Sequence, residues 1–336
     1  MTSSDSSVTT TTAEPPGLTG LVLIYCKGLA MGAADAVPGV SGGTIALITG
    51  IYERLIRALT ALDPAVLWHL PTLHRKRART AFLDELVEMD LPFLVALGLG
   101  MVTAVVILAR VVQLALSTAP GPTFAFFFGL IGASALVLYD RAWLASPGRV
   151  VAAILGFTVA FLVAGATAAD AVPHTLPVVF VAGAVAISGM VLPGISGAFI
   201  LLLLGQYDYM TATLNSFVDN AFAFATGGNA NPFLDAATVV VVFVAGAFVG
   251  LFTVAYAVRA AFVRYRAATF SFLISLMLGA LRYPGIRIVE TTESWTPTAS
   301  AGVLTAAIVG VGAVLLLDRY TDDLDYTGTD DGSADE

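Results

Sequence analysis

The sequence predicts an all-α polytopic membrane protein, an inverted repeat with two re-entrant broken-helix hairpins and about six transmembrane spans. Three observations predict it: the composition, a Pro-Gly-x-Ser-Gly motif that occurs twice, and the placement of the basic residues. Of 336 residues, 57% are hydrophobic and only 12% are charged, roughly half the charged fraction of a soluble protein. Apolar residues also form runs long enough for a membrane-spanning helix, which needs about 20 residues.

Two kinds of apolar segment occur along the chain. Six are continuous and are candidate spans: 91–116, 123–139, 150–168, 236–258, 267–281 and 301–317. Two others, about 18–50 and 178–205, are interrupted by Pro and Gly near the middle. Proline removes a helix hydrogen bond and glycine lowers helix propensity, so a broken helix is expected in both. Each arm, at about 15 residues, is too short for a full span.

The two interrupted regions are copies of one another. When residues 28–52 are aligned with 183–207, nine of 25 positions are identical, among them Pro38/Pro193, Ser41/Ser196 and Tyr52/Tyr207. A second similarity relates Thr123–Phe126 to Thr269–Phe272. Each half therefore holds one broken region followed by three spans. The expected organisation is membrane repeats at 18–169 and 170–318, between disordered tails at 1–17 and 319–336.

Basic residues predict the orientation of the two halves. The loop after the first motif carries Arg54, Arg57 and a basic run at 75–79, whereas residues 206–235 carry no Lys or Arg. By the positive-inside rule the first loop is cytoplasmic and the second external. Because three spans separate the motifs, we expect the halves to be inverted. The same count predicts a multi-pass protein of the cytoplasmic membrane with both termini cytoplasmic.

The sequence offers little for enzyme chemistry. Cys26 is the sole cysteine, the three histidines are scattered in expected loops, and no phosphate-binding loop or hydrolase motif occurs. We therefore expect no catalytic residue, no metal, no cofactor and no nucleic-acid partner. The expected partner is the lipid bilayer, and the oligomeric state is left open, a homo-oligomer included.

The repeated motif predicts an anion-binding site. Inverted repeats with broken helices are typical of secondary transporters, and the second helix of each break presents free N–H groups and a positive dipole end. Glycines there let a ligand approach the backbone. The candidate substrate-binding residues are Ser41, Gly42, Gly43, Thr44, Ser196 and Gly197. The alternative is that both motifs cap helices that pack tightly through small residues.

Ionisable residues at membrane depth add further candidates. Asp35, three residues before Pro38, is the candidate for ion coupling, as a proton or cation relay or as a partner of Lys27. Lys27, Arg110 and Arg259 are candidate phosphate ligands. Snorkelling is the alternative for Arg110, and a positive-inside anchor is the alternative for Arg259.

Tyr52 and Tyr207, which occupy matching positions in the two copies, are interpreted as aromatic anchors at the membrane interface.

The segment from Lys27 through Val37-Pro38-Gly39-Val40-Ser41-Gly42-Gly43-Thr44 to Gly50-Ile51-Tyr52-Glu53 resembles the signature of the DUF 368 family. The second motif, Leu192 through Gly197 with Gly205 and Tyr207, fits the same family, and so does Phe127 through Gly132. The resemblance covers about residues 20–318. One departure is Ala198-Phe199, where a small polar pair is expected.

The resemblance implies a polyprenyl-phosphate translocase that returns the lipid carrier of envelope glycan synthesis to the cytoplasmic leaflet. Its substrate would be undecaprenyl phosphate in bacteria or dolichyl phosphate in archaea. One alternative is an integral membrane polyprenyl diphosphate phosphatase, although Gly42 stands where the similar loop of such enzymes has arginine. The other is an ion-coupled anion or solute transporter.

Overall fold

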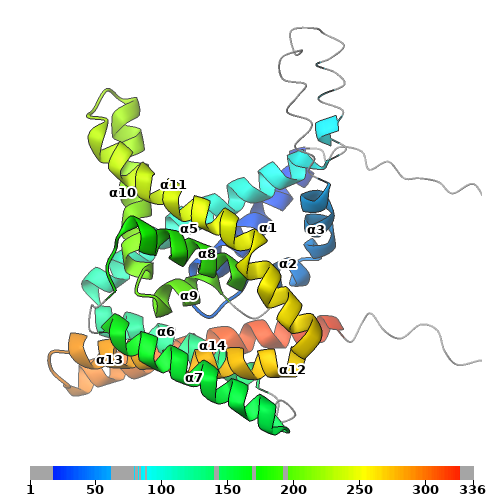
Figure 1. Cartoon of the computed structure of the whole chain (residues 1–336). Helices are drawn as coiled ribbons and strands as arrows, with labels where there is room; N and C mark the ends of the chain where they lie inside the picture. Colours follow the sequence, from blue (N-terminus) through cyan, green and yellow to red (C-terminus); the bar gives the residue numbers. More distant parts are fainter. Residues whose placement is uncertain are drawn as a thin grey trace, which may run out of the picture.

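In the computed structural model, every regular element among the described residues is a helix. It describes residues 18–61, 79, 82, 85–87, 89–139, 144–168, 172–191 and 196–325. The helices, labelled in Figure 1, are α1 (Leu18–Ala36), α2 (Gly42–Ile48), α3 (Tyr52–Thr60), α5 (Leu91–Thr118), α6 (Pro120–Val137), α7 (Pro147–Ala168), α8 (Leu176–Val191), α9 (Gly197–Leu203), α10 (Tyr207–Ala225), α11 (Asn231–Phe252), α12 (Val254–Ala280), α13 (Arg282–Thr291) and α14 (Pro297–Asp325).

The all-helical membrane fold is confirmed. Among the described residues, seven helical stretches are long and apolar enough to cross a membrane: Leu18–Ala36, Leu91–Thr118, Pro120–Val137, Pro147–Ala168, Asn231–Phe252, Val263–Thr291 and Pro297–Arg319. Six of them contain or overlap the six predicted spans. The seventh is α1, whose 19 residues exceed the arm length predicted for the first broken region, so that length was wrong. The other first arm, α8, has 16 residues and stays short of a span.

Three helices lie where the sequence predicted no regular structure. The stretch 206–235, taken as an external loop, contains all of α10 and the start of α11. α10 mixes Asn, Asp, Thr and Ser with aromatic residues, and this composition hid it from a search for continuous apolar runs. α3 and α13 were not predicted for the same reason, because their polar residues interrupt any continuous apolar run. At the C-terminus, α14 continues to Asp325, so disorder was the wrong prediction for 319–325. The expected tail at 1–17 and residues 326–336 lie outside the described residues.

The two halves use matching glycines to pack their helices. A Cβ on Gly28 of α1 would collide with the Leu97 carbonyl of α5. A Cβ on Gly183 of α8, the repeat partner of Gly28, would collide with the Phe243 carbonyl of α11. Close backbone approach through small residues is typical of helix packing in membranes. The sequence repeat is therefore also a repeat of packing: α1 lies on α5 as α8 lies on α11.

The later helices of each half are exchanged between the halves. α6 of the first half packs on α14 of the second, and α12 of the second half packs on α7 of the first. A Cβ on Gly310 would collide with the Phe126 carbonyl, and one on Gly156 with the Phe272 carbonyl. Phe126 and Phe272 are the residues matched by the second sequence similarity. The halves are thus intertwined rather than separate domains (Figure 1).

The second arms of the two broken regions, α2 and α9, pack in different apolar clusters. α2 packs in a cluster with α1, α3 and α5 that includes Ile24, Ala46 and Phe93. α9 packs in a larger cluster built around the buried aromatic residues of α6, with α7, α12 and α13. A hydrogen bond from Ser196 to the Val37 carbonyl joins the two breaks, and the candidate site lies at this junction.

Candidate functional site

The first helix break begins where α1 ends at Ala36 and finishes where α2 begins at Gly42. Pro38 is among the most deeply buried side chains of the described chain. Gly39 has a φ of 95°, which favours glycine, and its missing Cβ faces the backbone of Leu130 and Ile131 on α6. The break is therefore fixed against α6.

Three carbonyls freed by the break accept hydrogen bonds from side-chain hydroxyls of distant segments. Tyr207 Oη of α10 donates to the Ala36 carbonyl at 2.6 Å. Ser196 Oγ donates to the Val37 carbonyl at 3.3 Å, and Ser134 Oγ of α6 donates to the Gly39 carbonyl at 2.6 Å. We call these three contacts the hydroxyl clasp. It gives the Ala36 and Gly39 carbonyls a donor, which a buried carbonyl at membrane depth needs. It also adds a second donor to the Val37 carbonyl, which accepts from the Val40 N–H at 3.4 Å.

The clasp corrects one interpretation of the sequence. Tyr207 was expected to anchor the protein at the membrane interface, but it is 3% exposed and bonded to the end of α1. Its ring lies edge-on to Phe127, with the ring centroids 5.8 Å apart. Its identity in both copies of the repeat was the only sequence signal of a special role, while nothing near Ser134 in sequence pointed to its partner, 95 residues away.

Asp35 is the buried carboxylate of the break. It is 9% exposed, and its Oδ1 accepts a hydrogen bond from the Gly42 backbone N–H at 2.7 Å. The pairing of Asp35 with Lys27 that the sequence left open is not formed: Lys27 Nζ donates instead to the Thr49 carbonyl just after α2, at 2.7 Å. Asp35 and Lys27 thus contact opposite ends of α2, as expected for charges that complement a helix dipole.

Ser41, directly before α2, has a hydroxyl without a partner. The side chain is 5% exposed, and its Oγ is one of few buried polar atoms in the described chain without a hydrogen bond. A buried unpaired hydroxyl costs about 1–3 kcal/mol. Gly42 and Gly43 open α2 beside it, and Thr44 follows. Among the predicted substrate ligands, Ser41 is thus the residue with an unused donor.

The second motif is used differently. Ser196 caps α9 by accepting a hydrogen bond from the Phe199 N–H at 3.4 Å while it donates to Val37. Its hydroxyl is committed to structure on both sides. Gly197 is the first residue of α9. Pro193, Gly194 and Ile195 lie outside the described residues.

Neither of the two predicted arginines is seen in contact with the break among the described residues. Arg110 of α5 forms a salt bridge with Asp219 of α10, and both side chains are about half exposed. Its charge is therefore already matched. Arg259 lies on α12, and its side chain is outside the described part of the structure. A role of either in binding substrate stays a prediction.

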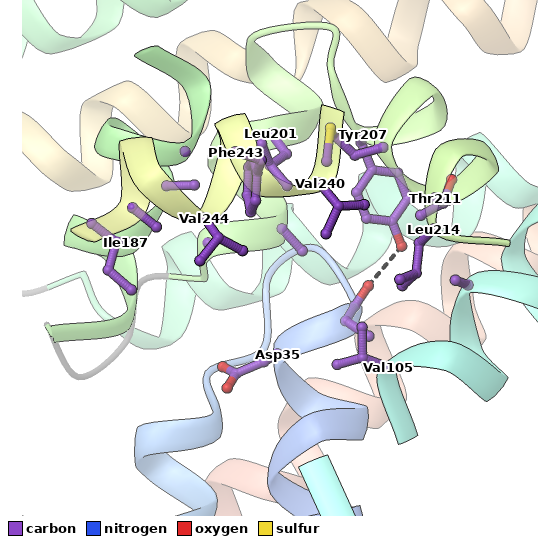
Figure 2. A pocket seen from close by; sticks show the side chains of 18 residues that line it. Asp35, Val105, Ile187, Leu201, Tyr207, Thr211, Leu214, Val240, Phe243 and Val244 are labelled. Atoms are coloured by element: carbon purple, nitrogen blue, oxygen red, sulfur yellow. Dashed lines mark hydrogen bonds between the residues drawn. The ribbon is translucent and has the colours of Figure 1, made fainter. Parts of the chain in front are cut away.

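A cavity of about 300 Å³ lies beside the break. It is formed between α1, α5, α8, α9, α10 and α11, so both halves contribute to it (Figure 2). Its polar lining residues are Asp35, Tyr207 and Thr211; all others are Ala, Gly, Val, Ile, Leu, Met or Phe. Figure 2 shows Asp35 at one end and the Tyr207 hydroxyl turned toward α1, where it is bonded. The cavity therefore offers an apolar wall with one carboxylate at its edge.

The fold and this cavity define a multi-pass helical membrane protein whose two halves enclose an apolar chamber. Residues 31–302 match the family described as VCA0040-like, undecaprenyl phosphate translocase-like. The chain belongs to this family, the DUF 368 family that its motifs resemble.

Two curated relatives are named polyprenyl-phosphate transporter. The protein of Vibrio cholerae is 35% identical over 279 residues, covering 82% of this chain and 80% of the relative. The protein of Staphylococcus aureus is 28% identical over 209 residues, covering 59% of this chain and 66% of the relative. No solved structure matches the chain.

The clasp makes a prediction about stability. Tyr207→Phe keeps the aromatic packing but leaves the Ala36 carbonyl without its donor, so we expect a loss of about 1–3 kcal/mol. Thermal unfolding of the purified protein in detergent would measure it. Tyr209→Phe, which keeps the ring that stacks on His174, is the matched control. Equal melting temperatures for the two variants would contradict a structural role for the Tyr207 hydroxyl.

Proposed function

We propose that this protein transports polyprenyl phosphate across the cytoplasmic membrane, recycling the lipid carrier. The observation that carries the proposal is the apolar cavity that adjoins a buried polar break. Such a pairing complements an amphiphile with an isoprenoid chain and a phosphate head group. The names of both relatives support the same substrate class.

The cavity suits the isoprenoid part of the ligand. Val105 and Ala109 of α5 face it from the first half, and Val240 and Val244 of α11 from the second. Each CH₂ group buried against such a wall contributes about 0.8 kcal/mol. A small hydrophilic anion would gain little here, because the walls offer few hydrogen-bond donors. The lining thus favours a lipid over a water-soluble solute.

The phosphate would be held by the first motif. Ser41 supplies the unused hydroxyl, and Gly42, Gly43 and Thr44 follow it in the first turn of α2. The second motif, Ser196 and Gly197, would contribute mainly by holding the break in shape. Lys27, Arg110 and Arg259 are further proposed ligands whose charges would attract the head group.

Asp35 would couple transport to a cation. While its carboxylate is ionised and holds the Gly42 N–H, it repels a phosphate approaching Ser41. Uptake of a proton removes this repulsion and frees the N–H for the phosphate. Binding of the anion and binding of the proton would then favour each other, and such positive coupling is what a symporter requires.

The alternating exposure of this site would follow from the repeat. We propose that the two halves are inverted, that each broken region forms a re-entrant hairpin, and that the termini are cytoplasmic. The exchanged packing of α6 on α14 and α12 on α7 supports a pseudo-symmetric arrangement. Rocking of one half against the other about a fixed central site is common in transporters of this build.

The first test fills the cavity. Ala109→Phe places a ring in the chamber and should reduce transport in proteoliposomes by about tenfold or more, because it displaces the isoprenoid chain. A phosphatase added outside would measure the substrate in the outer leaflet through the phosphate it releases. Val102→Phe, on the same helix and 62% exposed, is the control and should transport normally. Equal transport by both variants would contradict the proposal that the isoprenoid chain occupies the cavity.

The second test removes the titrating carboxyl. Asp35→Asn removes the carboxylate that a proton or sodium ion would neutralise, so transport should stop responding to a transmembrane proton or sodium gradient. The wild-type protein should respond. Asp219→Asn, which removes a carboxylate from the surface pair with Arg110, should respond as the wild type does. An unchanged gradient dependence in Asp35→Asn would rule out Asp35 as the coupling group.

A further inference from the structure

One wall of the cavity is formed where α10 lies against α5. α5 lines the cavity with Val105 and Ala109, and α10 lines it with residues that include Met210, Thr211 and Leu214. α5 belongs to the first half of the chain and α10 to the second, so this contact is one of the places where the halves meet beside the cavity. The function proposed above gives the contact itself no role.

Two polar pairs join these helices. Asn215 Nδ2 of α10 donates to Gln113 Oε1 of α5 at 2.5 Å. One turn away on each helix, Arg110 and Asp219 form a salt bridge, in which Arg110 Nη1 also lies 3.4 Å from Asp219 Oδ2. We call these two pairs the α5–α10 seam. The seam directly adjoins the cavity, because Asn215 follows Leu214 of the cavity wall.

The seam holds the helices together only weakly. The side chains of Arg110 and Asp219 are 47% and 61% exposed, and an ion pair so open contributes little net stability. Asn215 is buried, yet its Oδ1 has no hydrogen-bond partner. A buried acceptor without a donor is unfavourable. Separating the helices would therefore cost little at the ion pair and would let the Asn215 carbonyl be hydrated.

The neighbouring helix contacts are much tighter. Gly32 of α1 lies against the α5 backbone and Gly250 of α11 against the α8 backbone, so closely that neither position has room for a Cβ. α10 is fixed to α11 by aromatic stacking, since the Phe233 ring lies 5.4 Å from that of Phe217 and 5.6 Å from that of Phe224. α1 with α5 is thus one body, α8 with α10 and α11 is another, and the seam is where they separate most easily.

We propose that the α5–α10 seam is a gate for the phosphate head group, closed in this structure and opened when α5 and α10 separate. The inference rests on the proposed function for the identity of the ligand. A phosphate loses its hydration along the apolar cavity walls, which is costly unless other donors replace water. In the open seam the amides of Gln113 and Asn215 and the guanidinium of Arg110 supply such donors.

The hydroxyl clasp is the pivot of this movement. Tyr207 at the start of α10 is bonded to the Ala36 carbonyl at the end of α1, so the two bodies stay joined there while the seam, farther along α10, opens. Asp35, the proposed coupling group, is not part of the seam. Changes at the seam should therefore alter the rate of transport and not its dependence on an ion gradient.

Cross-linking tests the gate in the full chain. In a Cys26→Ser background, Gln113→Cys combined with Asn215→Cys places two thiols across the seam, and a short bifunctional methanethiosulfonate joins them after reconstitution. Cross-linking should slow polyprenyl phosphate transport in proteoliposomes about tenfold or more, because a gate that cannot open limits the rate. Reduction of the cross-link should restore transport.

The matched control joins α10 to α11 within one body. Phe217→Cys combined with Phe233→Cys, at positions whose rings stack in the native chain, should transport equally fast with and without the cross-link. Undiminished transport by the seam pair, with its linkage verified by mass spectrometry, overturns the inference.

A second measurement loosens the gate and needs no cross-link. Leu214→Cys in the same background reports on the cavity wall through its rate of reaction with a water-soluble maleimide in detergent. Adding Gln113→Ala should speed this reaction at least about fivefold, because the buried Asn215 amide loses the partner that only the closed seam provides. Adding Asn220→Ala instead, whose amide donates to Ser216 of its own helix, should leave the rate unchanged.

Equal reaction rates with and without Gln113→Ala would also overturn the inference. The reaction with maleimide involves no transported lipid, so its outcome is independent of the proposed function. That function fails separately if wild-type proteoliposomes do not move polyprenyl phosphate.

Discussion

The hydroxyl clasp on the first helix break is the interaction on which the rest of the site depends. A break at membrane depth frees backbone carbonyls that lipid cannot satisfy. Here the Ala36, Val37 and Gly39 carbonyls receive donors from Tyr207, Ser196 and Ser134. Two of those donors come from the second half of the chain, so the first half cannot complete its own break. The fold is therefore one unit despite its internal repeat.

The clasp determines which polar groups the site can offer to a ligand. By holding the end of α1 against α9 and α10, it places Asp35 at the edge of the apolar cavity and next to the start of α2. It uses the hydroxyls of Ser196 and Tyr207 and leaves that of Ser41 free. The two related motifs thus differ: the hydroxyl of the second is used in structure, whereas the first keeps a buried hydroxyl without a partner, which the proposed function assigns to the phosphate. Sequence divergence at Asp35, whose repeat partner is Met190, agrees with this division.

Much of the architecture could be predicted from the sequence, because apolar run length and the repeated motif are local signals. The six predicted spans correspond to helices, and the motifs resemble the family to which the chain belongs. The clasp could not be predicted, since it joins residues such as Ala36 and Tyr207 that lie 171 positions apart. The sequence offered Lys27 as a partner of Asp35, whereas the structure pairs the Asp35 carboxylate with the Gly42 N–H at the start of α2. α10 was missed because its polar residues conceal a helix.

The central claim is that the isoprenoid chain enters the cavity between the halves while the phosphate lies at Ser41. Photocrosslinking tests this most directly, with a polyprenyl phosphate that carries a photoreactive group on its first isoprene unit, followed by peptide mass spectrometry. If the isoprenoid chain occupies the cavity, adducts should form on cavity-lining residues such as Val105, Ile187 and Val244 and should be lost in Ala109→Phe. Adducts confined to lipid-facing residues such as Val102 and Leu99, which are 62% and 58% exposed, would contradict it.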